Sequence, residues 1–199
     1  MSIAQDTIHI QVETPLGTMK GYLYNETPQH RDNFAKLAGE GYYDSILFHR
    51  VIPGFMIQGG DPDSKNAKPG TALGMGGPGY QVPAEFVDSL AHVKGAIAAA
   101  RNNNPEKKSS GSQFYIVSGR PVAPTELSLQ EFKHHFKYPE SVKKEYAALG
   151  GASFLDHDYT VFGRITEGLD LIDKIAAAPA DSRNRPLDNI WMKITILAK

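Results

Sequence analysis

The stretch TIHIQVETPLGTMKGYLY, residues 7–24, decides the class of fold. Ile8, Ile10 and Val12 alternate with polar residues, and this two-residue period is typical of a β-strand with one buried face. TPLGT then interrupts the alternation, and MKGYLY continues as a second strand. The pattern predicts that the chain begins with a β-hairpin.

Further short apolar segments follow the hairpin. Each has the length of a strand and is bounded by Gly, Pro, Asn or Asp. They cover residues 46–52, 55–58, 95–100, 113–117, 160–164 and 190–197. With two helices far apart in the sequence, about eight such strands indicate a mainly β protein, an antiparallel barrel or a sandwich, rather than βαβ units.

These two helices are predicted from periodicity and from end signals. Residues 27–41 start with Thr27 as an N-cap and Pro28 in the first turn, and glycines end the segment. In residues 167–179, apolar side chains recur on one helical face before Pro179. We therefore expect one helix early in the chain and one near its end.

The segment from Pro121 to Ser153 has helical periodicity as well. Ser128 and Glu131 have the spacing of a capping box, and a second helix is expected after Pro139. The apolar positions of these two short helices are Leu129, Phe132, Phe136, Val142, Tyr146 and Leu149. The segment is predicted to interrupt the series of strands.

Composition limits the classes of protein that this chain can represent. Its 199 residues are 41% hydrophobic and 22% charged, which suits a single domain over residues 1–199. The net charge of -1 gives no electrostatic case for a nucleic-acid or membrane partner. There is no cysteine for thiol chemistry, and no signal-like N-terminus or apolar run of ~20 residues. We expect a monomeric cytoplasmic protein.

Two motifs are tested and set aside. GMGGPG, residues 74–79, fits the spacing of a dinucleotide-binding loop, but YQVPAEF follows it instead of a helix. The adjacent residues His134 and His135 point about 100° apart on a helix and cannot chelate one ion from one face. We interpret them as part of a solvated face, and we expect no metal and no cofactor.

The stretch FHRVIPGFMIQGGD, residues 48–61, points to a binding groove. Met56 and Gln58 share one face of the expected strand, and Gln113 and Tyr115 share a face of another. A core strand seldom aligns a glutamine with its buried residues. These faces are therefore predicted to line a groove that holds an apolar group beside a polar backbone.

Five motifs in order, FHRVIPGFMIQGGD, GPGYQVPAEF, GAIAAAR, GSQFYIVSG and TVFGRITEGLDLIDKI, resemble the cyclophilin family of peptidyl-prolyl cis-trans isomerases. The resemblance covers nearly the whole chain except residues 121–153, which we call the helical insertion. It implies a closed eight-stranded antiparallel β-barrel capped by two α-helices. It also implies rotation about Xaa-Pro bonds in polypeptide substrates, without a covalent intermediate.

The resemblance assigns roles to individual residues. Arg50 matches the catalytic arginine of the family. The positions that match the pocket for the proline ring are Phe55, Met56, Tyr115 and Leu155. The positions that match the rest of the peptide groove are Gln58 and Gln113 as amides, Ala100 and Arg101 as a backbone edge, Tyr159 where many members have His, and Phe154 where many eukaryotic members have Trp.

The chain departs from the family in three places. Tyr115 stands where the family usually has Phe. Its additional hydroxyl must form a hydrogen bond inside the protein or contact water. Phe154 lacks an indole N–H, so weak cyclosporin binding is expected. The helical insertion enters beside Phe154, and two interpretations stay open: it is a lid, specificity element or partner surface, or a decoration in which Phe132, Phe136 and Tyr146 pack on one another.

Two other functions compete with an isomerase. In one, the chain is a proline-peptide binding module or chaperone accessory that uses the helical insertion as a partner surface. In the other, the barrel carries a small ligand, which would need an interior cavity that large side chains are expected to fill. The preferred residue before proline and the physiological substrates are not predicted.

Overall fold

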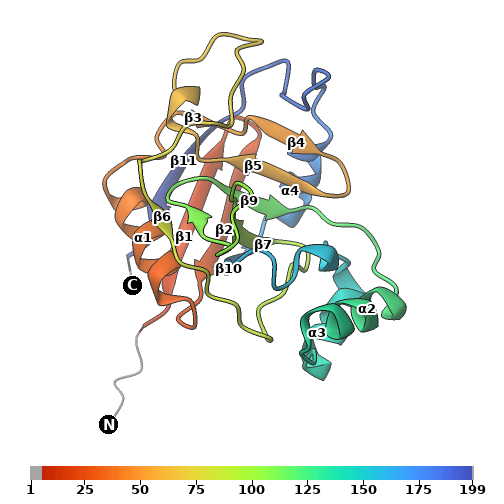
Figure 1. Ribbon diagram of the computed structural model, residues 1–199. Coiled ribbons are helices and arrows are strands. Elements are labelled where there is room, and N and C mark those ends of the chain that lie inside the picture. Colours follow the sequence, from red (N-terminus) through yellow and green to blue (C-terminus); the bar gives the residue numbers. More distant parts are fainter. Residues whose placement is uncertain (1–5, 199) are drawn as a thin grey trace.

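The computed structural model describes residues 6–198, which form a curled antiparallel main sheet, a small two-stranded sheet of β6 and β8, and four α-helices (Figure 1). The strands are β1 (Ile8–Thr14), β2 (Gly17–Leu23), β3 (Ile46–Leu47), β4 (Arg50–Ile52), β5 (Met56–Gly59), β6 (Gln81–Val82), β7 (Ala96–Ala99), β8 (Ser109–Ser110), β9 (Phe114–Val117), β10 (Val161–Glu167) and β11 (Trp191–Ile196). The helices are α1 (Pro28–Gly39), α2 (Pro124–His134), α3 (Glu140–Leu149) and α4 (Leu169–Ala176), with 3-10 turns η1 (Pro62–Ser64) and η2 (Ser153–Leu155).

The predicted N-terminal hairpin is confirmed. β1 and β2 pair from Ile8 opposite Leu23 to Thr14 opposite Gly17. The Thr14 hydroxyl donates to the carbonyl of Gly17 across 2.9 Å and so closes the turn. Alternate residues such as Ile10 and Met19 are fully buried, as the two-residue period requires.

The main sheet has the strand order β3-β11-β1-β2-β10-β7-β9-β5-β4. The strand predicted over residues 46–52 is divided, because its first half pairs with β11 and its second half with β5. Phe48 and His49 lie between the halves and bond to each side, through Phe48 N–H to Ile190 O and His49 N–H to Gln58 O. A mainly β, antiparallel fold is thus confirmed, and complete closure of the barrel stays a prediction.

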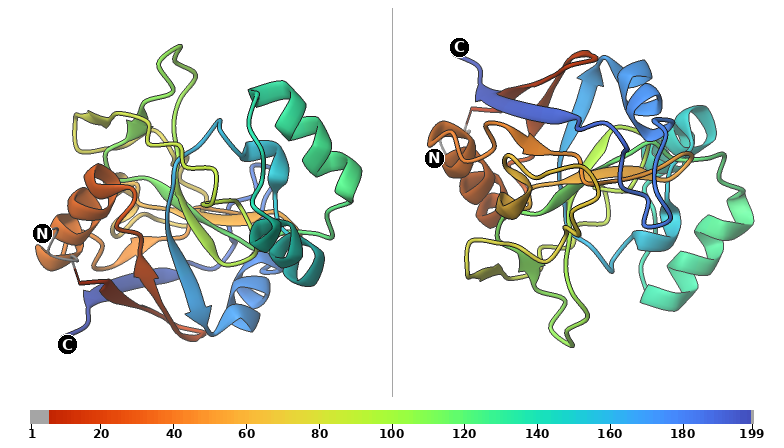
Figure 2. Two further views of the ribbon diagram at one scale, coloured as in Figure 1. Left: turned by 90° about the horizontal axis from the view of Figure 1, so that it is seen from below. Right: turned by 90° about the horizontal axis from the view of Figure 1, so that it is seen from above.

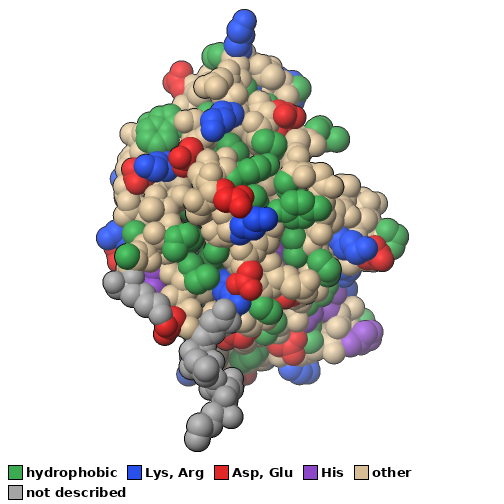
Figure 3. Space-filling model, turned by 90° about the vertical axis from the view of Figure 1, so that its left-hand side faces the viewer, with side chains coloured by type: hydrophobic (Ala, Val, Ile, Leu, Met, Phe, Trp, Pro, Cys, Tyr) green, Lys and Arg blue, Asp and Glu red, His purple; other side chains and the backbone are tan. Residues whose placement is uncertain are grey.

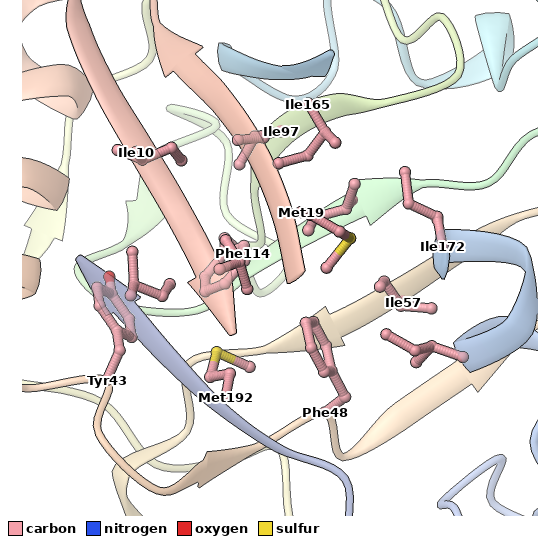
Figure 4. Packing of buried hydrophobic residues seen from close by; sticks show 14 of the residues in the cluster. Ile10, Met19, Tyr43, Phe48, Ile57, Ile97, Phe114, Ile165, Ile172 and Met192 are labelled. Carbon is pink, nitrogen blue, oxygen red and sulfur yellow. The ribbon is translucent and has the colours of Figure 1, made fainter. Parts of the chain in front are cut away.

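Large apolar side chains fill the concave side of the sheet (Figure 4). Met19, Phe48, Ile57, Phe114 and Met192 are each at most 2% exposed there. Each fully buried side chain of this kind contributes about 1.5 to 3 kcal/mol relative to an exposed one. This packing leaves no support for the interpretation as a small-ligand carrier, which needs an open interior.

Both predicted capping helices are present and lie at opposite sides of the sheet (Figures 1 and 2). α1 buries Phe34 and Leu37 against the core, and α4 buries Ile172 and Ile175. The predicted N-cap position of α1 is confirmed. Thr27 is the N-cap residue and is fully buried, although its hydroxyl makes no capping hydrogen bond.

The helical insertion forms two helices, but their ends differ from the prediction. α2 begins at Pro124, four positions before the proposed cap at Ser128, whose hydroxyl donates to the Pro124 carbonyl from inside the helix. Glu126 accepts a 3.0 Å hydrogen bond from the Ala123 N–H instead. Proline at the first position and a carboxylate in the first turn both favour this earlier start.

The buried face of α2 also differs from the apolar stripe of its sequence. Leu127 and Glu131 are buried, whereas Phe132 is 79% exposed. Phe136 and Tyr146 do share a cluster, but it includes Ala91 and Val93 of the main body. Docking on this body segment, rather than self-packing, sets the orientation of the two helices, which stand at one side of the sheet (Figure 2).

The surface carries charges of both signs. Figure 3 shows the side that lies left in Figure 1, where Lys and Arg side chains are interspersed with Asp and Glu. This distribution agrees with the net charge of -1 and gives no extended field of one sign on that side. Among residues 6–198, no helix has the length and apolar character needed to cross a membrane.

Candidate active site

The β4–β5 hairpin places Arg50 next to two glutamines. Arg50 lies opposite Gln58 in the strand pairing, and its Nη1 donates to Gln58 Oε1 across 3.2 Å. Gln58 Nε2 donates in turn to Gln113 Oε1, also across 3.2 Å. Gln113 Nε2 then bonds to the carbonyls of Gly74 and Gly76 at 3.0 and 2.7 Å. This row of side chains holds the guanidinium in a defined orientation.

The glycine-rich loop that mimicked a nucleotide motif therefore has another role. With Gln58, Gln113 and Ala100 it lines a cavity of about 980 Å³. Asp61 accepts a 2.5 Å hydrogen bond from Gly74 N–H, and a Cβ added at Gly76 would lie 2.1 Å from the same carboxylate. The glycines allow this close approach, and the loop forms one wall of the groove.

A cluster of apolar side chains adjoins Arg50 on the same side of the sheet, because Arg50, Gln58 and Tyr115 lie opposite one another on neighbouring strands. Met56 and Tyr115 are buried in one cluster, with Phe55, Leu155 and Tyr159 partly buried around them. Phe154 lies at the rim, 44% exposed, with its ring centroid 5.4 Å from that of Phe55. The structure thus brings together every residue that the resemblance assigns to the proline pocket.

The Tyr115 hydroxyl has the partner that the sequence required. It lies 2.9 Å from Nε2 of His92, a fully buried residue. Burial raises the pKa of Tyr115 well above its usual value, so the phenol stays protonated. The hydroxyl that Tyr115 adds relative to Phe is therefore hydrogen-bonded inside the protein, without contact with water.

Ala100 and Arg101 lie on the far side of the groove. The Ala100 N–H donates to Gln113 O at 2.9 Å and its carbonyl accepts from Ser110 N–H at 2.8 Å, so its N–H is already used. The guanidinium of Arg101 stacks on the ring of Tyr159 at 4.7 Å and donates to the Asp158 carbonyl. Both residues shape the groove, and the Ala100 N–H is not available to a peptide.

A smaller cavity of about 270 Å³ lies behind Arg50 and was not predicted. His49, Arg183 and Arg185 line it together with Arg50. Burial, as the largest cause, lowers the pKa of His49 to about 4, so the imidazole is neutral at physiological pH. The cluster of basic residues at 183–185 is visible in the sequence, but only the fold brings it to this place.

The prediction of a solvated face at His134 and His135 is half wrong. The His134 side chain is only 11% exposed, stacks on His157 and lies 3.4 Å from an Asp158 carboxylate oxygen. His135 is exposed at the end of α2 in a left-handed backbone conformation. α2 packs against η2, and this contact buries part of the helix face that the sequence predicted to be solvated. Within residues 6–198, no group of three or more His, Cys, Asp or Glu side chains could hold a metal ion.

The fold is that of solved cyclophilins. The structure is similar to a cyclophilin type peptidyl-prolyl cis-trans isomerase from Cryptosporidium parvum, with a TM-score of 0.71, 23% identity and coverage of 98% of this chain and 99% of that chain. A second structure of that protein, in the presence of the dipeptide Ala-Pro, gives a TM-score of 0.70 at 24% identity, over 96% and 99% of the two chains.

The sequence places the chain in a family. Residues 8–196 match the model of the cyclophilin type peptidyl-prolyl cis-trans isomerases, so the chain belongs to this family. It is 35% identical over 192 residues to the "Putative peptidyl-prolyl cis-trans isomerase" of Staphylococcus aureus (strain USA300), covering 94% of this chain and 90% of the relative. It is 34% identical to a "Putative bifunctional phosphatase/peptidyl-prolyl cis-trans isomerase" of Streptococcus pyogenes, with 91% of this chain and 37% of that protein covered. Its activity is peptidyl-prolyl cis-trans isomerisation, on proline-containing peptides.

Proposed function

We propose that Arg50 is the catalytic residue of this isomerase and that the groove from Phe55 to Gln113 binds the substrate. The observation that carries the proposal is the row from Arg50 through Gln58 to Gln113 along the edge of an apolar pocket. The pocket holds the proline ring, and the amides bind the flanking chain. The part of the substrate before proline is then free to turn.

The chemistry requires a donor aimed at the proline nitrogen. In the planar bond this nitrogen shares its lone pair with the carbonyl, which gives a barrier of ~20 kcal/mol. At the twisted transition state the lone pair is localised, so an N–H donor binds it more strongly than in either ground state. Arg50 fits because one Nη is committed to Gln58 while the remaining donors of the fork are available.

No nucleophile or general base takes part in this mechanism. Shortening a ~30 s event to milliseconds needs about 6 kcal/mol of transition-state stabilisation. A charged hydrogen bond supplies about 1.5 to 3 kcal/mol of this. The remainder comes from the apolar surroundings of Met56 and Tyr115, which exclude water, and from preferential binding of the twisted form.

Weak cyclosporin binding is part of the same proposal, because Phe154 offers a ring but no N–H at the rim of the pocket. A monomeric state, a cytoplasmic location and a single domain with a helical insertion stay predictions from the sequence. The alternative use, a proline-peptide binding module, involves the same groove, and only turnover distinguishes it from the proposed enzyme.

The test is cis-trans exchange in an Ala-Pro-Phe peptide, followed by NMR with the native protein and the Arg50→Ala variant at equal concentration. We expect the native protein to accelerate exchange by orders of magnitude. Arg50→Ala should lower kcat by about 10- to 150-fold, equivalent to one charged hydrogen bond, and should still bind peptide. Binding with negligible acceleration by the native protein would support the binding module instead.

A further inference from the structure

The hydroxyl of Tyr115 is the first member of a buried chain of hydrogen bonds that ends in the helical insertion. It lies 2.9 Å from Nε2 of His92, whose Nδ1 lies 2.6 Å from Oδ1 of Asp156. The other carboxylate oxygen, Oδ2, accepts hydrogen bonds of 2.5 Å from the hydroxyls of Tyr138 and Tyr146. Both tyrosines belong to the insertion, so these contacts join it to the proline pocket.

Donors and acceptors along this chain follow from the network. Asp156 accepts from the backbone N–H of His92 and from both insertion hydroxyls, so its carboxylate acts as an acceptor throughout. The His92 ring therefore donates to it through Nδ1 and offers Nε2 as an acceptor. Tyr115 donates to Nε2. Its ring then faces the pocket cluster with its hydroxyl tied to the imidazole.

Burial makes this chain sensitive to the loss of any member. His92 is 0% exposed and Asp156 is 2% exposed, and the three tyrosines are each at most 5% exposed. A buried polar group that loses its partner cannot bond to water instead, and this free-energy cost favours rearrangement of the groups around it. Loss of the insertion hydroxyls would thus disturb Asp156, then His92, and then Tyr115.

Asp156 also acts on the other wall of the pocket. It follows directly after η2, the turn that carries Phe154 and Leu155. The carbonyl of His92 accepts a 2.8 Å hydrogen bond from Ala152 N–H, just before this turn. The same anchor therefore fixes both the ring of Tyr115 and the segment that forms the rim.

We propose that the helical insertion positions the proline pocket, with Tyr138, Tyr146, Asp156 and His92 as positioning residues that act through Tyr115 and through the η2 turn. The proposal rests on the proposed substrate site. It gives the insertion a role in substrate affinity, in place of the open choice between a lid and a decoration. None of these four residues needs to touch the substrate.

The test uses conservative substitutions that remove hydroxyl groups and keep every ring. The double variant Tyr138→Phe/Tyr146→Phe removes both hydroxyl donors from Oδ2 of Asp156. Tyr115→Phe removes the hydroxyl at the other end of the hydrogen-bond series. All three are then combined. Tyr43→Phe serves as the matched control, because Tyr43 is fully buried in the main core and its hydroxyl donates to the Ser112 carbonyl, away from the helical insertion. KM and kcat are measured for an Ala-Pro-Phe peptide well below the unfolding temperature of each variant.

We expect the double variant to raise KM about five-fold with little change in kcat, because a looser pocket weakens ground-state and transition-state binding alike. In the Tyr115→Phe background the same pair should change KM by a smaller factor, because the route through Tyr115 is cut and only the link of Asp156 to η2 remains. An equal rise in both backgrounds overturns the proposal, as does an unchanged KM in the otherwise native chain. Single substitutions, each leaving one donor on Oδ2, give intermediate values if the double variant folds poorly.

Failure of the proposed site gives a different pattern. If Arg50→Ala keeps the native rate, the assignment of the catalytic residue is wrong, whatever the tyrosine variants do. Peptide affinity measured by NMR titration then tests the positioning role without reference to turnover. A rise in Kd for the double variant that is smaller in the Tyr115→Phe background supports it, and an equal Kd in all variants overturns it.

Discussion

Arg50 and Gln58 form a cross-strand pair in which the backbone register and the side-chain hydrogen bond coincide. The two residues lie opposite each other in the β4–β5 hairpin, and Nη1 of one donates to Oε1 of the other at 3.2 Å. The guanidinium is therefore already oriented by its own scaffold. Such preorganisation is what electrostatic stabilisation of a transition state requires.

The first prediction concerns the planar geometry of the Arg50 guanidinium. Arg50→Lys keeps the positive charge but replaces planar donors with a single ammonium, which cannot hold Gln58 and reach the proline nitrogen together. We expect kcat to fall about ten-fold, less than in Arg50→Ala, with peptide affinity retained. Exchange spectroscopy measures the rate. Native activity in Arg50→Lys would show that charge alone is sufficient.

The second prediction follows from the pKa of His49, which burial lowers to about 4. Between pH 6.5 and 4 the unfolded chain binds a proton at this residue and the folded chain does not, so stability falls as the pH falls. From pH 7 to pH 4.5 this amounts to about 2 kcal/mol of unfolding free energy. Urea unfolding at both pH values should show a loss smaller by this amount in His49→Leu. The same loss in variant and native protein contradicts the prediction.

The third prediction concerns cyclosporin. Phe154→Trp places an indole N–H at the rim of the pocket, where the side chain is 44% exposed. One additional hydrogen bond of about 0.5 to 1.5 kcal/mol should tighten binding by up to about ten-fold. Phe132→Trp, on the exposed face of α2, is the matched control and should leave affinity unchanged. Isothermal calorimetry gives both constants, and an unaltered Kd for Phe154→Trp would count against the assigned rim.

The fourth prediction tests the backbone beside the groove. Gly60 has φ of +93°, and an added Cβ would lie 2.2 Å from the Ser112 carbonyl oxygen. Gly60→Ala should therefore lower the unfolding free energy by about 2 kcal/mol or more. Gly39→Ala, in α1 with open space around the new methyl group, should instead stabilise by about 0.5 to 1 kcal/mol. Chemical denaturation compares the two, and equal effects would contradict the steric argument.

Much of the fold was predictable because its signals are local. The hairpin of β1 and β2 and the helices α1 and α4 follow from apolar periodicity and from Pro and Gly at their ends. The division of residues 46–52 was not predictable, since it depends on two different partner strands. The buried face of α2 was predicted incorrectly for the same reason: docking against Ala91 and Val93 outweighs the apolar stripe that includes Phe132.

The candidate site was likewise predicted only in part from the sequence. Motifs around Arg50 and Tyr115 predicted the groove, but nothing in the spacing of His92 and Asp156 marked them as partners of Tyr115. They are 64 residues apart, and their contact arises only when the segments before β7 and after α3 meet. Arg183 and Arg185 are likewise far from Arg50 in the sequence, and only the fold brings them to the cavity that Arg50 also lines.

By itself, the sequence determined the class of fold, the family and the chemical types in the groove, because strand alternation, turn residues and contiguous motifs are properties of short segments. Only the tertiary structure decided which polar groups are paired inside. A buried hydroxyl, imidazole and carboxylate are stable together only when long-range packing excludes water and supplies every donor with an acceptor. Hydrogen bonds that meet this requirement connect Tyr115, through His92 and Asp156, to the helical insertion.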